Sequence, residues 1–200
     1  MNLPNKLSVL RICLVPVFIV VMMLPETLFP GFDIWGPALG AFIFIVASLT
    51  DMLDGKIARK YNLITDFGKF IDPLADKFMV IGALLVIVYR YANIRPVFIW
   101  ATIIVIFREL AVTSIRLVAS SSSGVVIAAK YIGKIKTVSQ ILCVCAVIIE
   151  PLLYNNIPAL SGLSAYMPLT YVTTAVMTIF TLWSGIDYLV SYWKYLDPQK

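Results

Sequence analysis

The chain has 200 residues, of which 60% are hydrophobic and only 14% are charged, and its mean hydropathy is +0.92. Soluble domains carry about 25% charged residues, so this composition excludes an ordinary soluble protein and indicates an all-α integral membrane protein. The net charge is +5 and histidine is absent, which leaves carboxylates, lysines or tyrosines for any proton transfer. We expect no nucleic acid among the partners.

Six apolar segments follow one another, and we interpret them as six transmembrane helices of a single domain over residues 1–200. Their expected bounds are Val9–Leu28, Pro37–Arg59, Gly68–Tyr89, Val97–Leu117, Lys134–Leu153 and Pro168–Leu189. A crossing helix needs about 20 residues, yet only the last segment lies in a charge-free stretch of that length. Polar residues therefore enter one end of the other five.

Two further segments connect or precede these spans. Leucines at positions 3, 7, 10 and 14 recur at helical spacing, so an N-terminal amphipathic segment is expected before the first span. Residues 120–124 are four serines and a glycine, which we interpret as a flexible connector between the fourth and fifth spans.

The basic residues gather at one side of the predicted bundle. Threading six spans puts the N-terminus, the turns after spans two and four and the C-terminus on that side, leaving only Arg90 and Arg95 opposite. By the positive-inside rule the charged side faces the cytoplasm. The sequence thus predicts a multi-pass protein with a polar basin at the cytoplasmic side of the bilayer.

Four aspartates border the second and third spans. Asp51 and Asp54 lie three positions apart and Asp72 and Asp76 four apart, so on helices each pair projects from one face. Opposed faces would bring together four negative charges that repel one another without bound cations. Oxygen-only ligands suit hard divalent metals such as Mg²⁺, and a site with two metals indicates phosphate chemistry. The alternative is an ion-pair network with nearby lysines.

The aspartates belong to a longer pattern, D-x-x-D-G-x-x-A-R followed after eight residues by G-x-x-x-D-x-x-x-D. Gly55 and Gly68 leave room where helices and a bulky ligand approach closely. Arg59 has a planar guanidinium group that can bind a phosphate through two hydrogen bonds. Ala58 has a small side chain, which leaves space for the ligand on the facing wall.

This pattern resembles the signature of the CDP-alcohol phosphotransferase family, with every specified position filled. The resemblance implies that family's six-helix membrane fold and a homodimer. It also implies that the four aspartates hold two Mg²⁺ or Mn²⁺ ions on the pyrophosphate of a CDP-linked lipid, with Asp76 as the base that deprotonates the incoming alcohol. The residues implied to bind the CDP-lipid are Gly55, Ala58, Arg59, Thr65 and Gly68.

The first residues narrow the resemblance. Positions 2–8 with Arg11 are similar to the P-N-x-[LI]-[ST]-x-x-R opening of the bacterial branch that makes phosphatidylglycerol phosphate, and residues 133–137 with Gln140 resemble it too. Asn5 and Ser8 are therefore candidates for nucleotide contact. Their alternative role is that of turn and N-cap residues.

A phosphorylated acceptor needs cations beyond the metals. Arg108 and Arg116 lie eight apart on nearly one helical face, and Lys134 and Lys136 follow on the next span. We interpret these four as acceptor phosphate ligands. The alternative is a topology signal that also attracts anionic lipid headgroups. Glu109 is expected to orient an arginine rather than to react.

The resemblance implies transfer of the phosphatidyl group from CDP-diacylglycerol to glycerol 3-phosphate, giving phosphatidylglycerol phosphate and CMP in the bacterial cell membrane, with the site facing the cytoplasm. Within the family, the acceptor could instead be that of cardiolipin or phosphatidylinositol phosphate synthesis. Outside it, an intramembrane Mg²⁺-dependent prenyltransferase also pairs aspartates around a diphosphate. A divalent-cation transporter would need polar groups across whole spans, and here the outward halves are almost purely apolar.

Overall fold

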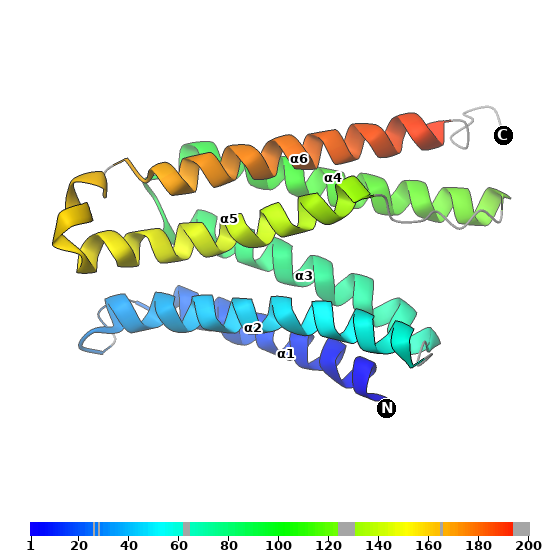
Figure 1. Ribbon diagram of the computed structural model, residues 1–200, viewed down its shortest axis with the longest axis horizontal. Helices are drawn as coiled ribbons and strands as arrows, with labels where there is room; N and C mark the ends of the chain where they lie inside the picture. The colour runs from blue at the N-terminus through cyan, green and yellow to red at the C-terminus, as the bar shows by residue number, and fades with distance from the viewer. Residues whose placement is uncertain (26, 28, 62–64, 124–130, 165, 194–200) are drawn as a thin grey trace.

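The computed structural model describes the chain except residues 26, 28, 62–64, 124–130, 165 and 194–200. The described part is helical and contains no strand, which confirms the all-α prediction (Figure 1). The long helices are α1 (Leu3–Met23), α2 (Phe32–Lys60), α3 (Asp66–Arg90), α4 (Arg95–Ser123), α5 (Tyr131–Asn156) and α6 (Pro168–Tyr192), and a short 3₁₀ helix, η1 (Pro158–Leu163), lies between the last two.

Within the described residues, five helices are long and apolar enough to cross a membrane. These segments are Leu3–Met23 of α1, Phe32–Ile57 of α2, Arg95–Val118 of α4, Tyr131–Tyr154 of α5 and Pro168–Tyr192 of α6. The helix α3 is not among them, because every 18-residue stretch of α3 includes at least three charged residues. The membrane character is thus confirmed, whereas a sixth span at α3 stays a prediction.

The N-terminal amphipathic segment is continuous with the first span, since α1 begins at Leu3 and ends at Met23. Its orientation differs from a membrane-surface helix: Leu3 and Leu10 are exposed, whereas Asn5 and Arg11 are buried. Asn5 and Arg11 of this segment therefore point into the bundle and Leu3 and Leu10 point outward, while Leu14 packs against the core.

The prediction of a flexible connector at residues 120–124 is wrong for the four serines, because α4 extends through Ser123. Gly124 lies outside the described residues. Serine is only moderately unfavourable in a helix, so a serine run does not by itself end one.

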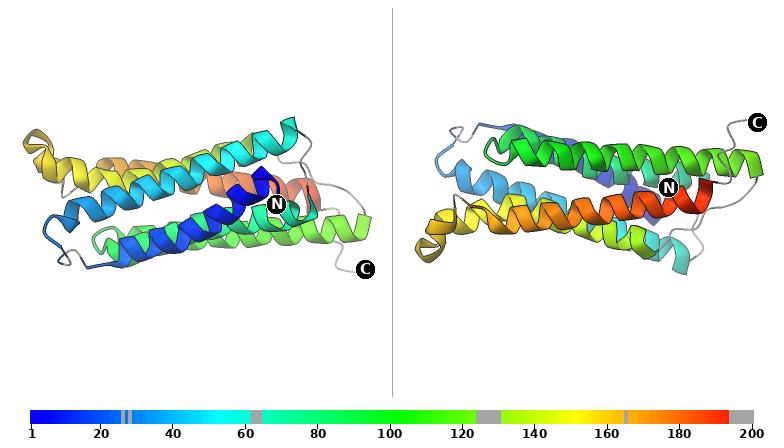
Figure 2. Two further views of the ribbon diagram at one scale, coloured as in Figure 1. Left: turned by 90° about the horizontal axis from the view of Figure 1, so that it is seen from below. Right: turned by 90° about the horizontal axis from the view of Figure 1, so that it is seen from above.

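The helices alternate in direction along the bundle. In Figures 1 and 2, α1, α3 and α5 begin toward the end at which α2, α4 and α6 finish, as the threading of the sequence predicted. The helix α1 packs against α2 and α3, while α5 packs against α2, α3 and α6, and α4 packs against α3 and α6. The first three helices and the last three thus meet through α3 and α5.

An apolar core fills the half of the bundle away from the aspartates. Phe18 and Phe44 pack with ring centroids 5.8 Å apart, and Leu84 and Ile148 are fully buried in the same cluster. On α1 and α3 these positions follow the polar residues, and on α2 they precede them. On these three helices the aspartates and their partners on α1 therefore lie at one end of the core.

A buried carboxylate ties the last two long helices together at the end opposite the aspartates. Glu150 of α5 is 1% exposed and accepts hydrogen bonds from the backbone N–H groups of Leu169 at 2.9 Å and Thr170 at 2.6 Å. Its other donor is the Tyr154 hydroxyl, at 2.7 Å. The first N–H groups of a helix lack partners within it and carry partial positive charge, so Glu150 caps α6 from a neighbouring helix.

We expect Glu150→Ala to lower the free energy of unfolding by about 1–3 kcal/mol, because buried N–H groups and a hydroxyl lose their acceptor. Thermal unfolding in detergent measures this loss. Tyr154→Phe is the matched control, since it removes one donor and leaves the cap on α6. An equal loss in both variants would contradict the assignment of Glu150 as the cap.

Candidate active site

An arginine from α1 lies between the two aspartates of α2. Arg11 is fully buried; its Nη1 lies 2.7 Å from Asp51 Oδ1, and its Nη2 donates to Asp54 Oδ2. Buried ions are tolerated when they are paired and hydrogen-bonded, and the guanidinium group can contact two carboxylates at once. Arg11 thus brings positive charge to the helix pair on which the acidic pattern lies.

A serine one turn earlier joins the second aspartate pair to the first. The Ser8 hydroxyl, also fully buried, lies 2.5 Å from Asp72 Oδ1 on α3 and 3.4 Å from Asp54 Oδ2 on α2. Because both carboxylates contact the same hydroxyl, their nearest oxygens lie within about 6 Å of each other. The faces of α2 and α3 that carry Asp54 and Asp72 therefore converge at this point.

The fourth aspartate differs from the other three. Asp76 Oδ1 is buried and has no hydrogen-bond partner among the residues that the structure describes. A buried carboxylate oxygen without a partner is costly, which marks it as a group that serves a ligand.

The aspartates are the candidate metal ligands of this site. In the described part of the chain, no three acidic or cysteine side chains form a ready-made metal cluster. The donor chemistry nevertheless fits a hard divalent cation, because carboxylates of α2 and α3 converge on Ser8 and Asp76 follows Asp72 by one turn on α3. The residues that could hold such ions are Asp51, Asp54, Asp72 and Asp76.

Three predicted nucleotide-binding residues meet where α1 passes the start of α3. The Asn5 amide donates to Thr65 Oγ1 at 2.9 Å, and Thr65 caps α3 by accepting from the Gly68 N–H at 3.0 Å. A Cβ on Gly68 would lie 2.9 Å from Asn5 Oδ1, so glycine permits this close approach. The N-cap of α1 is Asn2, so the alternative role of Asn5 and Ser8 as its N-cap is wrong.

The remaining motif positions lie in the last turns of α2. Gly55 is half-buried directly after Asp54. Ala58 and Arg59 belong to the same helix, but their side chains lie outside the described residues. Their contact with a nucleotide stays a prediction.

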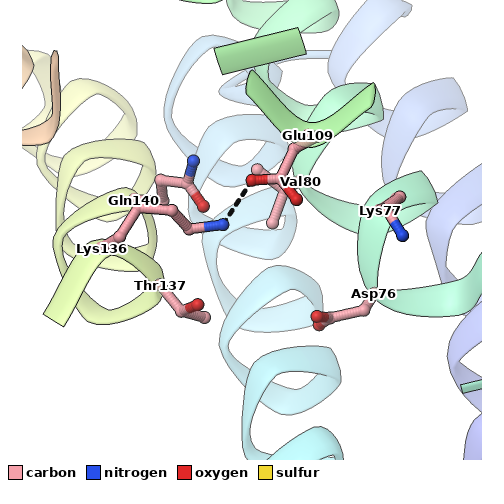
Figure 3. A pocket seen from close by; sticks show the side chains of 7 residues that line it. All are labelled: Asp76, Lys77, Val80, Glu109, Lys136, Thr137 and Gln140. Atoms are coloured by element: carbon pink, nitrogen blue, oxygen red, sulfur yellow. Dashed lines mark hydrogen bonds and ion pairs between the residues drawn. The ribbon is translucent and has the colours of Figure 1, made fainter. Parts of the chain in front are cut away.

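A small pocket opens beside Asp76 (Figure 3). It is lined by three helices: Asp76, Lys77 and Val80 of α3, Glu109 of α4, and Lys136, Thr137 and Gln140 of α5. Glu109 Oε1 accepts from Lys136 Nζ and, at 3.1 Å, from Arg108 Nη1. Glu109 thus orients two of the predicted acceptor ligands, which agrees with the role expected for it.

The two arginines of α4 share one aromatic ring on α6. The guanidinium carbons of Arg108 and Arg116 lie 5.7 Å and 5.0 Å from the Tyr188 ring centroid, and Arg116 donates to the Tyr188 hydroxyl at 2.7 Å. Arg108 also donates to Ser184 Oγ. The predicted common face of these arginines is confirmed, and it packs on Tyr188. Lys134 is exposed and does not line the pocket.

For two of the residues that organise this site, Arg11 and Tyr188, the sequence did not predict the side chains that they contact. Arg11 carried a signal, because an arginine at the start of an apolar run needs a buried anion or a path to water. Tyr188 carried none, because aromatic residues near the end of a span are ordinarily interpreted as an interfacial belt.

Comparisons with known proteins agree on one family. Residues 1–184 match the model of the CDP-alcohol phosphatidyltransferase family. A Bacillus subtilis protein named CDP-diacylglycerol–glycerol-3-phosphate 3-phosphatidyltransferase is 39% identical, with 98% of this chain and 97% of that protein aligned. Proteins of the same name from Escherichia coli K12 and Salmonella paratyphi A are 32% and 31% identical, each over 94% of this chain and 93% of the relative.

We expect Arg11→Met to lower the free energy of unfolding by about 3–5 kcal/mol in metal-free buffer, because Asp51 and Asp54 would lose their buried counter-charge. Added Mg²⁺ should recover part of the loss, since a bound cation offsets the same repulsion. Thermal unfolding in detergent with EDTA or Mg²⁺ measures both effects. Arg95→Met is the control, because exposed Arg95 bonds only backbone carbonyls in the described contacts. Equal losses in the two variants would rule out the counter-charge role.

Proposed function

This chain belongs to the CDP-alcohol phosphatidyltransferase family, and we propose that it transfers the phosphatidyl group of CDP-diacylglycerol to glycerol 3-phosphate, giving phosphatidylglycerol phosphate and CMP. The observation that carries the proposal is the sequence similarity, 39% and 32% identity over nearly the full length, to proteins named for this reaction. The site supports it, because an unpartnered carboxylate oxygen and buried basic side chains line or border the same pocket.

The charges around the pocket favour a phosphorylated acceptor. Lys136 lines the pocket. Arg108 forms an ion pair with Glu109, which also lines the pocket and also pairs with Lys136. Two cations against one carboxylate leave net positive charge, which suits the phosphate of glycerol 3-phosphate. Arg116 extends this charge along α4, where it contacts the same Tyr188 ring as Arg108.

The family is metal-dependent. We place two ions, Mg²⁺ or Mn²⁺, on Asp51, Asp54, Asp72 and Asp76, where they would neutralise the pyrophosphate so that CMP becomes an acceptable leaving group. Asn5, Thr65, Gly68 and the end of α2 would bind the nucleotide beside them.

The chain's own residues then carry the proton and the acceptor. Asp76 Oδ1 takes the proton of the primary hydroxyl of glycerol 3-phosphate. The oxygen of this hydroxyl then forms a bond to the phosphorus that bears diacylglycerol. The bond from this phosphorus to the CMP oxygen breaks, and CMP leaves with the electron pair. Lys136 and Arg108 hold the acceptor phosphate while its hydroxyl faces Asp76.

The same end of the bundle sets the proposed location. Apart from Arg90 of α3 and Arg95 of α4, the basic residues of α2, α3, α4 and α5 lie toward the end of the bundle that holds the aspartates, which favours a cytoplasmic site in the bacterial cell membrane. Glycerol 3-phosphate is water-soluble and would enter from that side, whereas CDP-diacylglycerol would enter from the bilayer. A homodimer is the family's implication for assembly and stays a prediction.

We expect Asp76→Asn to lower kcat for CMP release by about 100–10,000-fold, because an amide cannot accept the hydroxyl proton. The assay uses purified protein with CDP-diacylglycerol, glycerol 3-phosphate and Mg²⁺. Asp33→Asn is the control, since Asp33 is an exposed residue in the first turn of α2. Unchanged turnover in Asp76→Asn would remove this residue from the role of base.

We expect Tyr188→Phe to raise the KM for glycerol 3-phosphate by about 3–10-fold, because Arg116 loses the hydroxyl that positions it. The KM for CDP-diacylglycerol should not change, since the nucleotide side of the site is formed by α1, α2 and α3. Tyr171→Phe, in the exposed first turn of α6, is the control. A parallel rise in both KM values would point to a general packing role for Tyr188.

A further inference from the structure

A second buried polar side chain without a partner lines the pocket beside Asp76. Gln140 of α5 is 1% exposed, and neither its amide nitrogen nor its amide oxygen has a hydrogen-bond partner among the described residues. A side-chain amide offers two donors and an acceptor oxygen, and burying them unpaired is costly. Such a group in a pocket wall indicates that a ligand supplies the partners.

The place of Gln140 limits what that ligand group can be. Gln140 lies one turn after Lys136 on the same face of α5, and Figure 3 shows both side chains next to Glu109. Lys136 is already paired with Glu109, so the immediate surroundings of the amide are close to neutral. An anionic group would be drawn to the arginines of α4 rather than to a neutral amide.

The two unpartnered groups of the pocket differ in hydrogen-bond capacity. Asp76 Oδ1, when ionised, accepts only, which suits a hydroxyl that gives up its proton. The amide of Gln140 donates and accepts, which suits a hydroxyl that remains intact. A ligand with two hydroxyl groups on neighbouring carbons complements both.

We propose that Gln140 binds the secondary hydroxyl of the acceptor and thereby selects a glycerol-type alcohol. This inference rests on the proposed function, in which the primary hydroxyl of glycerol 3-phosphate faces Asp76 and its phosphate faces the basic residues. The secondary hydroxyl lies between these two groups. Gln140 is then a specificity-determining residue for the reaction.

The proposal makes a definite statement about substrate discrimination. A site built to hydrogen-bond a substrate hydroxyl rejects an analogue that lacks it, because the buried polar group is left unpaired again. The suitable analogue is 3-hydroxypropyl phosphate, which keeps the primary hydroxyl and the phosphate and lacks only the secondary hydroxyl. We expect the wild-type protein to prefer glycerol 3-phosphate by about 10–100-fold in kcat/KM.

The test measures CMP release from CDP-diacylglycerol with each acceptor, using the full-length protein and Gln140→Met. Methionine has nearly the shape of glutamine but cannot hydrogen-bond the hydroxyl. The variant should accept both substrates with kcat/KM values within about threefold of each other. Ser139→Ala is the matched control: Ser139 is buried on α5 and bonds the Lys136 carbonyl, so the wild-type preference should persist.

Thermal unfolding without substrate gives a second readout. If Gln140 serves the ligand, replacing its unpaired amide with an apolar group leaves the unfolding temperature unchanged or raises it. A fall of several degrees, or failure to fold, shows a structural role and overturns the proposal.

The outcomes separate this inference from the proposed function. If the wild-type protein releases no CMP with glycerol 3-phosphate, the proposed function itself fails. If it does, but Gln140→Met keeps the wild-type preference or loses both activities equally, only the role of Gln140 is overturned.

Discussion

A guanidinium group held between two carboxylates, at the junction of the first two helices, is the contact on which the polar end of this protein depends. Arg11 supplies a buried positive charge to Asp51 and Asp54, and Ser8 extends the contact to Asp72 on the third helix. Without such partners, acidic side chains bordering hydrocarbon would be strongly unfavourable. The N-terminal turns of α1 therefore belong to the site as much as the acidic pattern does.

The polar end divides into two parts with different chemistry. Carboxylates on α2 and α3 form one part, which suits cations and a pyrophosphate. Basic residues on α4 and α5 form the other, where Glu109 and Tyr188 hold them in place. Asp76 and Gln140 line the pocket between the parts, and each has a buried atom without a hydrogen-bond partner among the residues that the structure describes. Such incomplete hydrogen bonding is what a site has to retain if its substrate is to complete it.

Sequence patterns predicted the helices and the shared face of each aspartate pair because both follow from local periodicity. Spacings of three and four residues define a helical face wherever the helix lies. The direction of that face in the bundle depends on other helices, which is why α1 turns Leu3 and Leu10 outward and Arg11 inward. The partners of Arg116 were equally out of reach, since Tyr188 is 72 positions away in the chain. Serine runs, finally, are weak signals for the end of a helix, as α4 demonstrates.

The carboxylate of Glu150 has a consequence for how the protein can vary. It fixes the register between α5 and α6 where α6 begins, because it accepts hydrogen bonds from the backbone N–H groups of Leu169 and Thr170. The intervening residues 157–164 are largely exposed and need not set that register themselves. Mutational drift, including insertions, can accumulate in this connection while the end of the bundle that holds the aspartates stays aligned.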